Sequence, residues 1–368
     1  MKHKLIILSN WTTPIEKSWS GTTYSLTKAL SQYYDTEIRN LAIGKFLKTF
    51  EKLSRIAGIG ILFGMMYDKF LQIKANYILR KDKNLPVFEI CEDIRIKNPY
   101  FTYQDMTYKV GLDVKELNKK YKYIYPAAGN NVYSQKEMER RIHRQYKEYS
   151  HAKAVFFMSY WVKDLMTQHY PEISHKMIHI GGGTNIDAAK VNSNMKEGNK
   201  FLFIGRDFNR KAGDLVIEAF KILKSQTMPN AELHMAGCNP METYKDIYYY
   251  GDVNYDKISE LLNMCDVFCM PSRFEAYGLV FIESLIYGLP CIGRDFFEMP
   301  YFINKGNEGE LIKDDNPETL AKTMSAVISD KNMINQVQSN KELYLSKYSW
   351  DSVAKRAKVV IDKTLGWA

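Results

Sequence analysis

Long apolar runs are missing from this chain of 368 residues. No stretch approaches the roughly 20 consecutive apolar residues that a membrane-spanning helix needs. The apolar run Leu5–Leu8 near the N-terminus is too short for a signal peptide and instead predicts a first buried strand. We therefore expect neither a transmembrane helix nor a secretory leader.

Cysteine is scarce, with five scattered residues, Cys91, Cys238, Cys265, Cys269 and Cys291. Two of them, Cys265 and Cys269, lie close together, but their segment is apolar and has no histidine partner, which argues against zinc. No other metal-ligating cluster is visible, so we expect no metal and no cofactor. Buried free thiols in a reducing cytoplasm are the expected state.

Two recognition motifs are also absent. No Gly-x-Gly-x-x-Gly follows a predicted strand, which argues against a dehydrogenase. No aromatic residues interleave with basic ones as in nucleic-acid readers, so we expect no nucleic-acid partner. Residues 1–185 contain 29 Lys and Arg and 17 Asp and Glu, a net charge of +12, whereas the whole chain has a net charge of +9. Because of this basic half, a basic, non-enzymatic nucleic-acid-binding protein remains an alternative. An anionic membrane or a phosphate-bearing acceptor suits this basic half equally.

Buried-strand patterns alternate with helical patterns along the whole chain, as in α/β proteins with parallel sheets. The length and an apolar content of 45% favour two domains. Residues 186–199 are polar without periodicity and predict a linker, and Asn316 before Pro317 predicts a helix start. The expected strands are Leu5–Leu8, Val87–Ile90, Tyr100–Tyr103, Tyr123–Tyr125, Ala154–Met158, Met177–Ile180, Phe201–Ile204, Glu232–Met235, Val267–Met270 and Cys291–Gly293.

The segment Arg273–Glu283 carries the most specific chemical signal. Glu275 and Glu283 stand eight residues apart, and between them Gly278 opens an apolar, helix-like run. A helix start presents backbone N–H groups that bind phosphate oxygens. Glu283, about one and a half turns into the helix, can accept hydrogen bonds from sugar hydroxyls. The segment predicts a seat for a nucleotide-sugar diphosphate, with an ordinary buried strand-turn-helix as the alternative.

This motif, Glu275-x7-Glu283 followed by Gly288-Leu-Pro290, resembles the donor site of retaining GT-B glycosyltransferases of the family 4 type. The resemblance covers residues 150–360 well and 1–150 more loosely, and other segments match in order. These are Ser159–Lys163, Gly181–Asn185, Phe201–Arg206, Lys211–Asp214, His234–Gly237, Gly251–Val253, Leu261–Asp266 and Tyr348–Trp350.

The resemblance implies an α/β chain with GT-B architecture. Two Rossmann-like domains would face each other across a cleft, with ligands at the carboxyl ends of the strands. Residues 1–185 with 348–368 would form an acceptor-binding domain, because the C-terminal helix returns to it. Residues 186–199 would form the linker, and 200–347 the nucleotide-sugar-binding domain.

The resemblance also implies roles in the second domain. Arg206 and Lys211 would stabilise the leaving diphosphate, although two solvated loop charges remain an alternative. Glu283 would hold the ribose, and Glu275 would orient the transferred sugar as a catalytic residue. Backbone groups complete the donor site, from Gly205, Val253 beside the base, Gly278, Leu279 and Val280.

In the first domain, Gly21 precedes a predicted helix over Tyr24–Leu30 and would let the backbone approach the diphosphate. Alternatively, Ser20 or Thr22 caps that helix. Gln104 stands where the family has a histidine, and it can bond a sugar hydroxyl but cannot carry a proton. Asp105 is either an acceptor-side base or a loop carboxylate.

The implied reaction is metal-independent transfer of a sugar, with retention, from a nucleotide diphosphate to a carbohydrate or lipid-linked glycan. The acceptor hydroxyl attacks from the face that the diphosphate leaves, so no nucleophile is named. We expect a UDP-sugar rather than a GDP-sugar donor and a role in cell-envelope polysaccharide biosynthesis. A sugar-nucleotide epimerase or a phosphorylase on the same fold is the alternative; Gln104 argues mildly against the epimerase, and a phosphorylase would need a much longer chain with a pyridoxal lysine.

Within residues 45–70, Lys45, Lys48, Lys52 and Arg55 precede an apolar, glycine-containing stretch that is too short to cross a bilayer. This pattern predicts a peripheral contact with an anionic membrane, on its cytoplasmic face. A core helix of the first domain with a basic exposed turn is the alternative.

Overall fold

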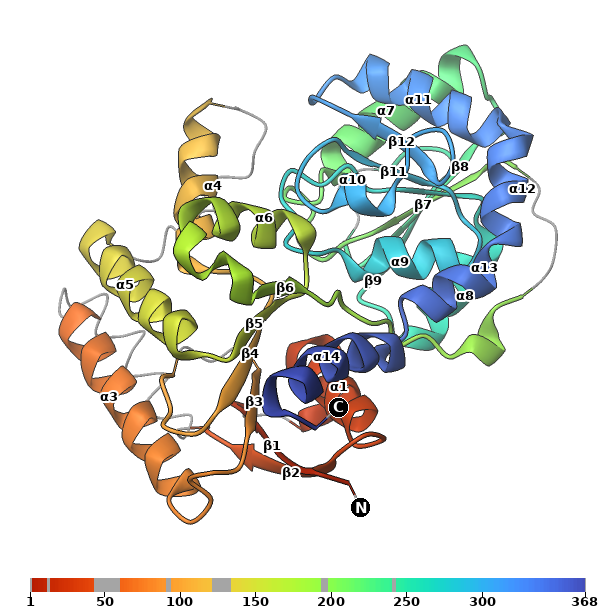
Figure 1. Cartoon of the computed structure of the whole chain (residues 1–368). Coiled ribbons are helices and arrows are strands. Elements are labelled where there is room, and N and C mark those ends of the chain that lie inside the picture. The colour runs from red at the N-terminus through yellow and green to blue at the C-terminus, as the bar shows by residue number, and fades with distance from the viewer. Residues whose placement is uncertain are drawn as a thin grey trace. The chain divides into compact units, whose positions relative to one another are not determined.

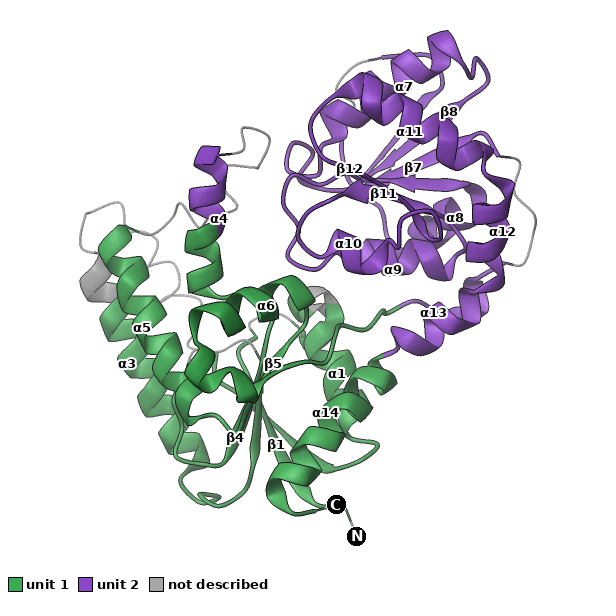
Figure 2. Ribbon diagram, turned by 45° about the horizontal axis from the view of Figure 1, so that its top comes forward, with its two compact units in different colours: residues 1–113, 129–185, 350–368 green, residues 114–128, 186–349 purple. Residues whose placement is uncertain are grey.

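The structure, a computed structural model, describes residues 2–11, 14–42, 60–90, 94–120, 134–192, 198–239 and 243–367. The chain divides into two compact units (Figure 2). Unit 1 comprises Met1–Asp113, Gly129–Asn185 and Trp350–Ala368, and unit 2 comprises Val114–Ala128 and Ile186–Ser349. The chain therefore passes between the units at residues 113/114, 128/129, 185/186 and 349/350.

Unit 1 is built on a six-stranded sheet in the order β2-β1-β3-β4-β5-β6, and all of its paired strands are parallel. Its strands are β1 (Lys4–Ser9), β2 (Asp35–Asn40), β3 (Val87–Ile90), β4 (Tyr100–Gln104), β5 (Ala154–Phe157) and β6 (Met177–His179). Its helices are α1 (Thr22–Leu30), α3 (Gly60–Leu79), α5 (Gln135–His151), α6 (Tyr160–His169) and α14 (Trp350–Leu365), and α4 (Tyr108–Lys120) is divided between the units. Figure 1 shows these elements in the red-to-green part of the chain, with α14 in blue.

Unit 2 repeats this architecture with a parallel sheet in the order β12-β11-β10-β7-β8-β9. Its strands are β7 (Lys200–Ile204), β8 (Glu232–Ala236), β9 (Ile247–Gly251), β10 (Val267–Cys269), β11 (Cys291–Arg294) and β12 (Gly309–Ile312). Its helices are α7 (Gly213–Gln226), α8 (Tyr255–Met264), α9 (Leu279–Ile286), α10 (Met299–Phe302), α11 (Pro317–Ser329), α12 (Lys331–Ser339) and α13 (Lys341–Lys347). Strand β10 and the middle of the neighbouring strand β7, Phe201–Phe203, are buried, as their apolar sequences predict.

The final helix, α14, packs against α1 in unit 1. Its first residue, Trp350, donates through Nε1 to Asn185 Oδ1 at 2.9 Å. A Cβ atom on Gly183 would lie 2.5 Å from the Trp350 ring, so glycine is required there. Asn185, after which the chain leaves unit 1, and Trp350, at which it returns, are thus fastened to each other.

Residues 186–192, predicted as linker, are attached to unit 2. Lys190 forms an ion pair with Asp256. The Asn263 side chain forms two hydrogen bonds: it accepts one from the Asn192 N–H at 2.9 Å and donates one to the Lys190 carbonyl at 2.7 Å. The predicted linker therefore begins as a fixed part of unit 2.

Most predicted strands are present within one or two residues of their predicted bounds. Asn316 caps α11 through the Thr319 N–H, as predicted. Tyr123–Tyr125 and Cys91 lie outside the described residues, and the other four cysteines are buried free thiols. In the described part of the chain, no helix is both long and apolar enough to cross a bilayer.

Candidate active site

The topology of unit 2 brings several loops together at the carboxyl ends of its strands. Strands β7 and β10 are neighbours, but the chain leaves β7 toward β8 and β9, and leaves β10 toward β11 and β12. At such a switch point the two outgoing loops diverge and leave a crevice at the carboxyl ends of the strands. The loop 205–212 follows β7, and the loop 270–278 follows β10.

Lys211 and Glu275 meet at this switch point. The Lys211 ammonium group forms an ion pair with Glu275 Oε2, and the two side chains are 12% and 10% exposed. Ser272 Oγ lies 3.4 Å from the same oxygen, and Arg210 Nη1 lies 3.9 Å from it. Burial lowers the pKa of Lys211, while the Glu275 charge opposes that shift. The Lys211 cation is thus largely desolvated and lies beside the Glu275 carboxylate.

Glycine at position 205 makes the placement of Lys211 possible. A Cβ atom on Gly205 would lie 2.8 Å from Lys211 Cγ and 3.0 Å from its Cβ. Gly237 has φ +83°, and a Cβ atom there would meet the Gly205 backbone at 2.9 Å. Larger residues at either position would displace the loop after β7, so both glycines shape the site.

The loop after β10 ends at the helix start that the sequence predicted. Gly278 adopts the left-handed conformation, with φ +98°, as the N-cap of α9, and no side chain caps that helix. A Cβ atom on Gly278 would lie 3.0 Å from Glu275 Cγ. Leu279 and Val280 follow in half-buried positions. The partial positive charge of this helix N-terminus therefore lies beside the Lys211–Glu275 pair.

Glu283 occupies the second turn of α9 and is 6% exposed. Burial raises its pKa to about 7, and a hydrogen bond from the Tyr255 hydroxyl, at 3.3 Å from Oε1, opposes that shift. Sequence reasoning missed Tyr255. Its position at the start of α8, two residues after Val253, was the available signal, because that turn also ends at the carboxyl edge.

Arg206 is placed differently from Lys211. Its guanidinium group binds Asp252 on the loop after β9, with Nη2 at 2.8 Å from Oδ1, and its side chain is 79% exposed. Val253 follows Asp252 in the same loop and is half-buried. The predicted cationic pair thus consists of one buried member beside Glu275 and one solvated member beside the predicted base-binding loop.

A second set of charged residues, also missed from the sequence, fixes the loop after β10. Arg294 is fully buried, donates to the Pro271 and Ser272 carbonyls and pairs with Asp315. Arg273 binds Asp315 at 2.6 Å and Asp214 at 2.7 Å. Ion pairs and hydrogen bonds to backbone carbonyls thus fix the loop around Ser272. This network makes the loop that bears Glu275 rigid.

In unit 1, Gly21 is the left-handed N-cap of α1, with φ +83°. The N-cap position is occupied by Gly21 and not by Ser20 or Thr22, the residues that the alternative named. A Cβ atom on Gly21 would lie 2.8 Å from Asn185 Nδ2, and Asn185 Oδ1 accepts from Ser25 at 2.6 Å. The turn is therefore tied to the segment where the chain leaves unit 1.

Gln104 ends β4 and is 3% exposed. Its side-chain amide donates to Thr102 Oγ1 of the same strand at 2.7 Å. Asp105 follows in a half-buried position. Both residues lie at the carboxyl edge of the unit 1 sheet, as Gly21 does.

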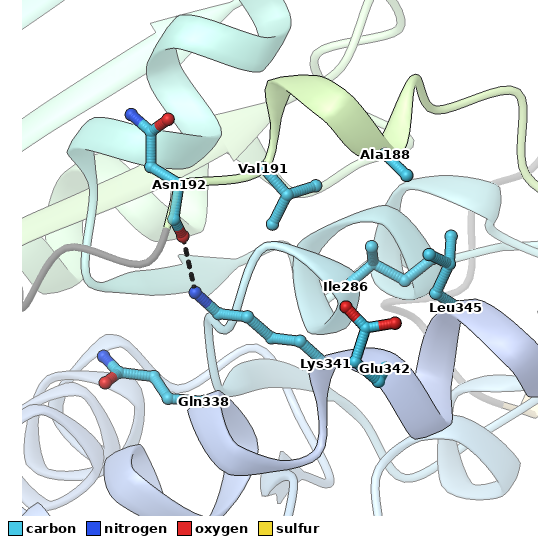
Figure 3. A pocket seen from close by; sticks show the side chains of 8 residues that line it. All are labelled: Ala188, Val191, Asn192, Ile286, Gln338, Lys341, Glu342 and Leu345. Atoms are coloured by element: carbon cyan, nitrogen blue, oxygen red, sulfur yellow. Dashed lines mark hydrogen bonds between the residues drawn. The ribbon is translucent and has the colours of Figure 1, made fainter.

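A cavity of ≈ 230 Å³ lies elsewhere in unit 2, between the segment 188–192, the end of α9, and helices α12 and α13. Figure 3 shows its lining, including Lys341, which donates to the Asn192 carbonyl at 2.8 Å. None of the predicted donor-site residues lines it. Among the described residues, no group of His, Cys, Asp and Glu could hold a metal ion.

The sequence of unit 2 is similar to a known family. Residues 185–343 match the family model described as glycosyl transferases group 1. An uncharacterized glycosyltransferase of Methanocaldococcus jannaschii is 30% identical over 168 residues, covering 42% of each chain. The capsular polysaccharide biosynthesis glycosyltransferase CapH of Staphylococcus aureus is 27% identical over 202 residues, covering 47% of this chain and 54% of that protein. The matched segment spans about half the length of these relatives, and these findings support an enzyme of the transferase class.

Solved structures match over the whole chain. The Anabaena protein HepE, in complex with UDP and glucose, has a TM-score of 0.63 at 14% identity, with 100% of both chains covered. At this identity the likeness shows the fold alone. The predicted fold class is confirmed: two parallel α/β units of the GT-B type.

Proposed function

We propose that this chain is a retaining glycosyltransferase of the family 4 type, which transfers a sugar from a nucleoside diphosphate to a carbohydrate or lipid-linked glycan. The observation that carries the proposal is the Lys211–Glu275 pair at the switch point of unit 2, beside the uncapped N-terminus of α9. A buried cation and a helix N-terminus together suit a diphosphate, since both stabilise negative charge.

Donor binding exchanges the partners of this pair. The diphosphate draws the Lys211 ammonium group away from Glu275, because two phosphate charges outcompete one carboxylate. Glu275 is then available to accept hydrogen bonds from hydroxyls of the transferred sugar, and Glu283 accepts from the ribose. Arg206 is solvated before binding, so it can leave Asp252 at little cost and close over the diphosphate.

The transfer step requires no nucleophile from the protein. The bond between the anomeric carbon and the diphosphate oxygen breaks, and the acceptor oxygen bonds to the same face of that carbon. The acceptor proton passes to the departing diphosphate oxygen. Lys211, Arg206 and the N–H groups of Gly278, Leu279 and Val280 stabilise the charge that develops on the diphosphate. In the acceptor-bearing unit, Gly21 would let the backbone approach the diphosphate, and Gln104 and Asp105 would contact the sugar side.

Several features support narrower choices. The UDP bound to HepE supports a UDP-sugar donor, and the name of the staphylococcal relative supports a role in cell-envelope polysaccharide biosynthesis. The free thiols at Cys238, Cys265, Cys269 and Cys291 suit a reducing compartment, so we place the enzyme in the cytoplasm. The proposal needs no cofactor and no metal ion.

Thermal-shift measurements test this proposal. UDP, GDP and ADP, each with and without EDTA, are added to the purified full chain. UDP at about 100 times its Kd should raise Tm by roughly 3–7 °C, and EDTA should leave that shift unchanged. An absence of stabilisation by every nucleoside diphosphate contradicts the proposal, and a shift that EDTA abolishes contradicts its metal independence.

Arg206→Ala should separate catalysis from stability. The side chain is exposed, so the variant should change the free energy of unfolding by less than about 0.5 kcal/mol. Turnover should fall roughly 10- to 100-fold, because one charge on the leaving group is left uncompensated. Asp252→Ala is the matched control, since it frees Arg206 without removing it and should retain turnover. If both variants lose activity equally, the loss comes from disturbing the loop after β9 and not from removing the Arg206 charge.

A further inference from the structure

Helix α3 carries an exposed apolar face. Five of the thirteen large apolar or aromatic residues that are exposed in the described chain lie on this one helix, at Met65, Met66, Phe70, Ile73 and Tyr77, each between 47% and 62% exposed. Four of them follow the spacing i, i+4, i+7 and i+11 from Met66, so they form one stripe, about 16 Å long. Water-exposed stripes of this kind mark interaction surfaces.

The opposite face of α3 is already occupied by its own unit. Leu71, Ala75 and Leu79 are buried. Asp68 pairs with Arg140 and Arg144 of α5, and Figure 2 shows α5 beside α3, with α3 at the outer edge of unit 1. The helix is thus apolar on both sides but needs only one side for the core, so folding does not account for the stripe.

The charges around the stripe have one sign. Lys69 and Arg80 are exposed along its border, and the Arg80 guanidinium group stacks on the Tyr77 ring at 3.7 Å. The acidic neighbours are engaged elsewhere, Asp68 by α5 and Asp82 by Arg39 at 2.7 Å. A surface that meets this face therefore encounters cations and apolar side chains.

A basic hollow continues the stripe at the C-terminal end of α3. It measures ≈ 620 Å³ and is lined by four cations, Lys4, Arg80, Lys81 and Lys83. Asp82 also borders the hollow, but its carboxylate already pairs with Arg39. The hollow offers several ammonium groups to a phosphate group, next to a stripe that would bury apolar chains.

We propose that the segment from Met65 in α3 through Lys83, just after that helix, docks unit 1 onto an anionic phospholipid bilayer. The stripe enters the boundary between headgroups and acyl chains, and the basic hollow holds lipid phosphates. This surface overlaps the C-terminal part of the predicted contact at residues 45–70, and the four basic residues that the prediction named, Lys45, Lys48, Lys52 and Arg55, lie outside the described residues. The proposal does not depend on the proposed sugar transfer, because no donor-site residue takes part.

Vesicle co-sedimentation of the full chain tests the docking. The wild-type chain should bind vesicles of phosphatidylglycerol and phosphatidylcholine at low salt, and bind pure phosphatidylcholine at least tenfold more weakly. Phe70→Gln/Ile73→Gln should lower the anionic-vesicle partition at least tenfold. Lys81→Ala/Lys83→Ala should lower it about fivefold per charge.

The matched control is Leu343→Gln/Val359→Gln, which removes two apolar residues from other helices that are more exposed, at 59% and 68%, than Phe70 and Ile73. This variant should bind vesicles like the wild type. Equal loss in the control, or no binding by the wild type, overturns the proposal. A dimer in analytical ultracentrifugation that Phe70→Gln/Ile73→Gln dissociates assigns the stripe to a second copy and also overturns it. The UDP-induced Tm shift should be the same in all these variants, so failure of docking is distinguishable from failure of donor binding.

Discussion

Lys211→Met should reduce kcat about 10²- to 10³-fold, the largest loss expected from any single change in this chain. Lys211 is the cation buried beside Glu275, and no other cation touches that carboxylate at hydrogen-bond distance in the described chain. Without it, the diphosphate leaves from a site with less positive charge. Steady-state kinetics with a UDP-sugar donor measures the effect.

The same change should also destabilise the fold. It leaves the Glu275 carboxylate, 10% exposed, with Arg210 at 3.9 Å as its nearest cation. Breaking a buried ion pair on one side costs on the order of 3 kcal/mol. Glu275→Gln in the Lys211→Met background should restore most of this stability without restoring turnover, because the uncompensated charge disappears but the cation stays absent.

Lys224→Met provides the matched control for that series. Lys224 binds Asp246 at 2.5 Å and the Pro229 and Ala231 carbonyls, in the same unit but at the far end of α7. Its loss should lower stability comparably and leave kcat unchanged in the folded fraction. If Lys224→Met and Lys211→Met lose turnover in proportion to stability, Lys211 has no special chemical role.

The second large effect concerns Glu283 and pH. Binding of a ribose requires the carboxylate, whereas burial raises the pKa of Glu283 to about 7. The affinity for a UDP-sugar should therefore be constant above pH 7 and fall toward tenfold per pH unit below it. Glu283→Gln should weaken binding about 10- to 100-fold at pH 8 and remove the pH dependence. A UDP-sugar is the right probe, since its diphosphate does not titrate in this range.

Tyr255→Phe checks the assignment of that titration. The Tyr255 hydroxyl lowers the Glu283 pKa by donating a hydrogen bond to the carboxylate, so its removal should move the midpoint above pH 7. Calorimetric titrations across pH 5.5–8.5 give the three profiles. Identical profiles for wild type and Glu283→Gln would exclude Glu283 from the binding event.

The same carboxylate affects folding without a ligand. Its pKa is raised above the unfolded value, so folding favours the protonated form. This contribution is fully present below the unfolded pKa, near 4.5, and is lost as pH rises through about 7. The loss amounts to ~3 kcal/mol relative to Glu283→Gln. Ligand-free wild type should thus gain stability relative to that variant as pH falls from 8 to 5.

Much of the fold could be predicted from the sequence, because buried parallel strands consist of short apolar runs. The strands that were missed show where that signal fails. Strand β2 has the sequence DTEIRN and lies at a sheet edge with none of its residues buried, so its residues carry no apolar pattern. Strands β9 and β12 are likewise the two edges of the other sheet. An edge strand buries one face at most. Whether such a segment forms a strand depends on its pairing with the neighbouring strand rather than on its own composition.

The site was predictable to the extent that local geometry reveals it. Gly278 and the spacing of Glu275 and Glu283 are features of one helix start, and a single segment contains them. Tyr255 and Arg294 were missed, since each reaches the site from a different strand or helix and the sheet order brings them close. For Tyr255 the sequence offered one signal, its position two residues after Val253. The burial that raises the Glu283 pKa is likewise a property of the packed unit.

A crystal structure of the chain with bound UDP tests the central claim most directly. The account predicts diphosphate oxygens within hydrogen-bond distance of Lys211 Nζ and of the N–H groups that begin α9, the ribose on Glu283, and Glu275 released from Lys211. UDP bound away from the carboxyl edge of unit 2, or bound there while Lys211 stays on Glu275, would contradict the account.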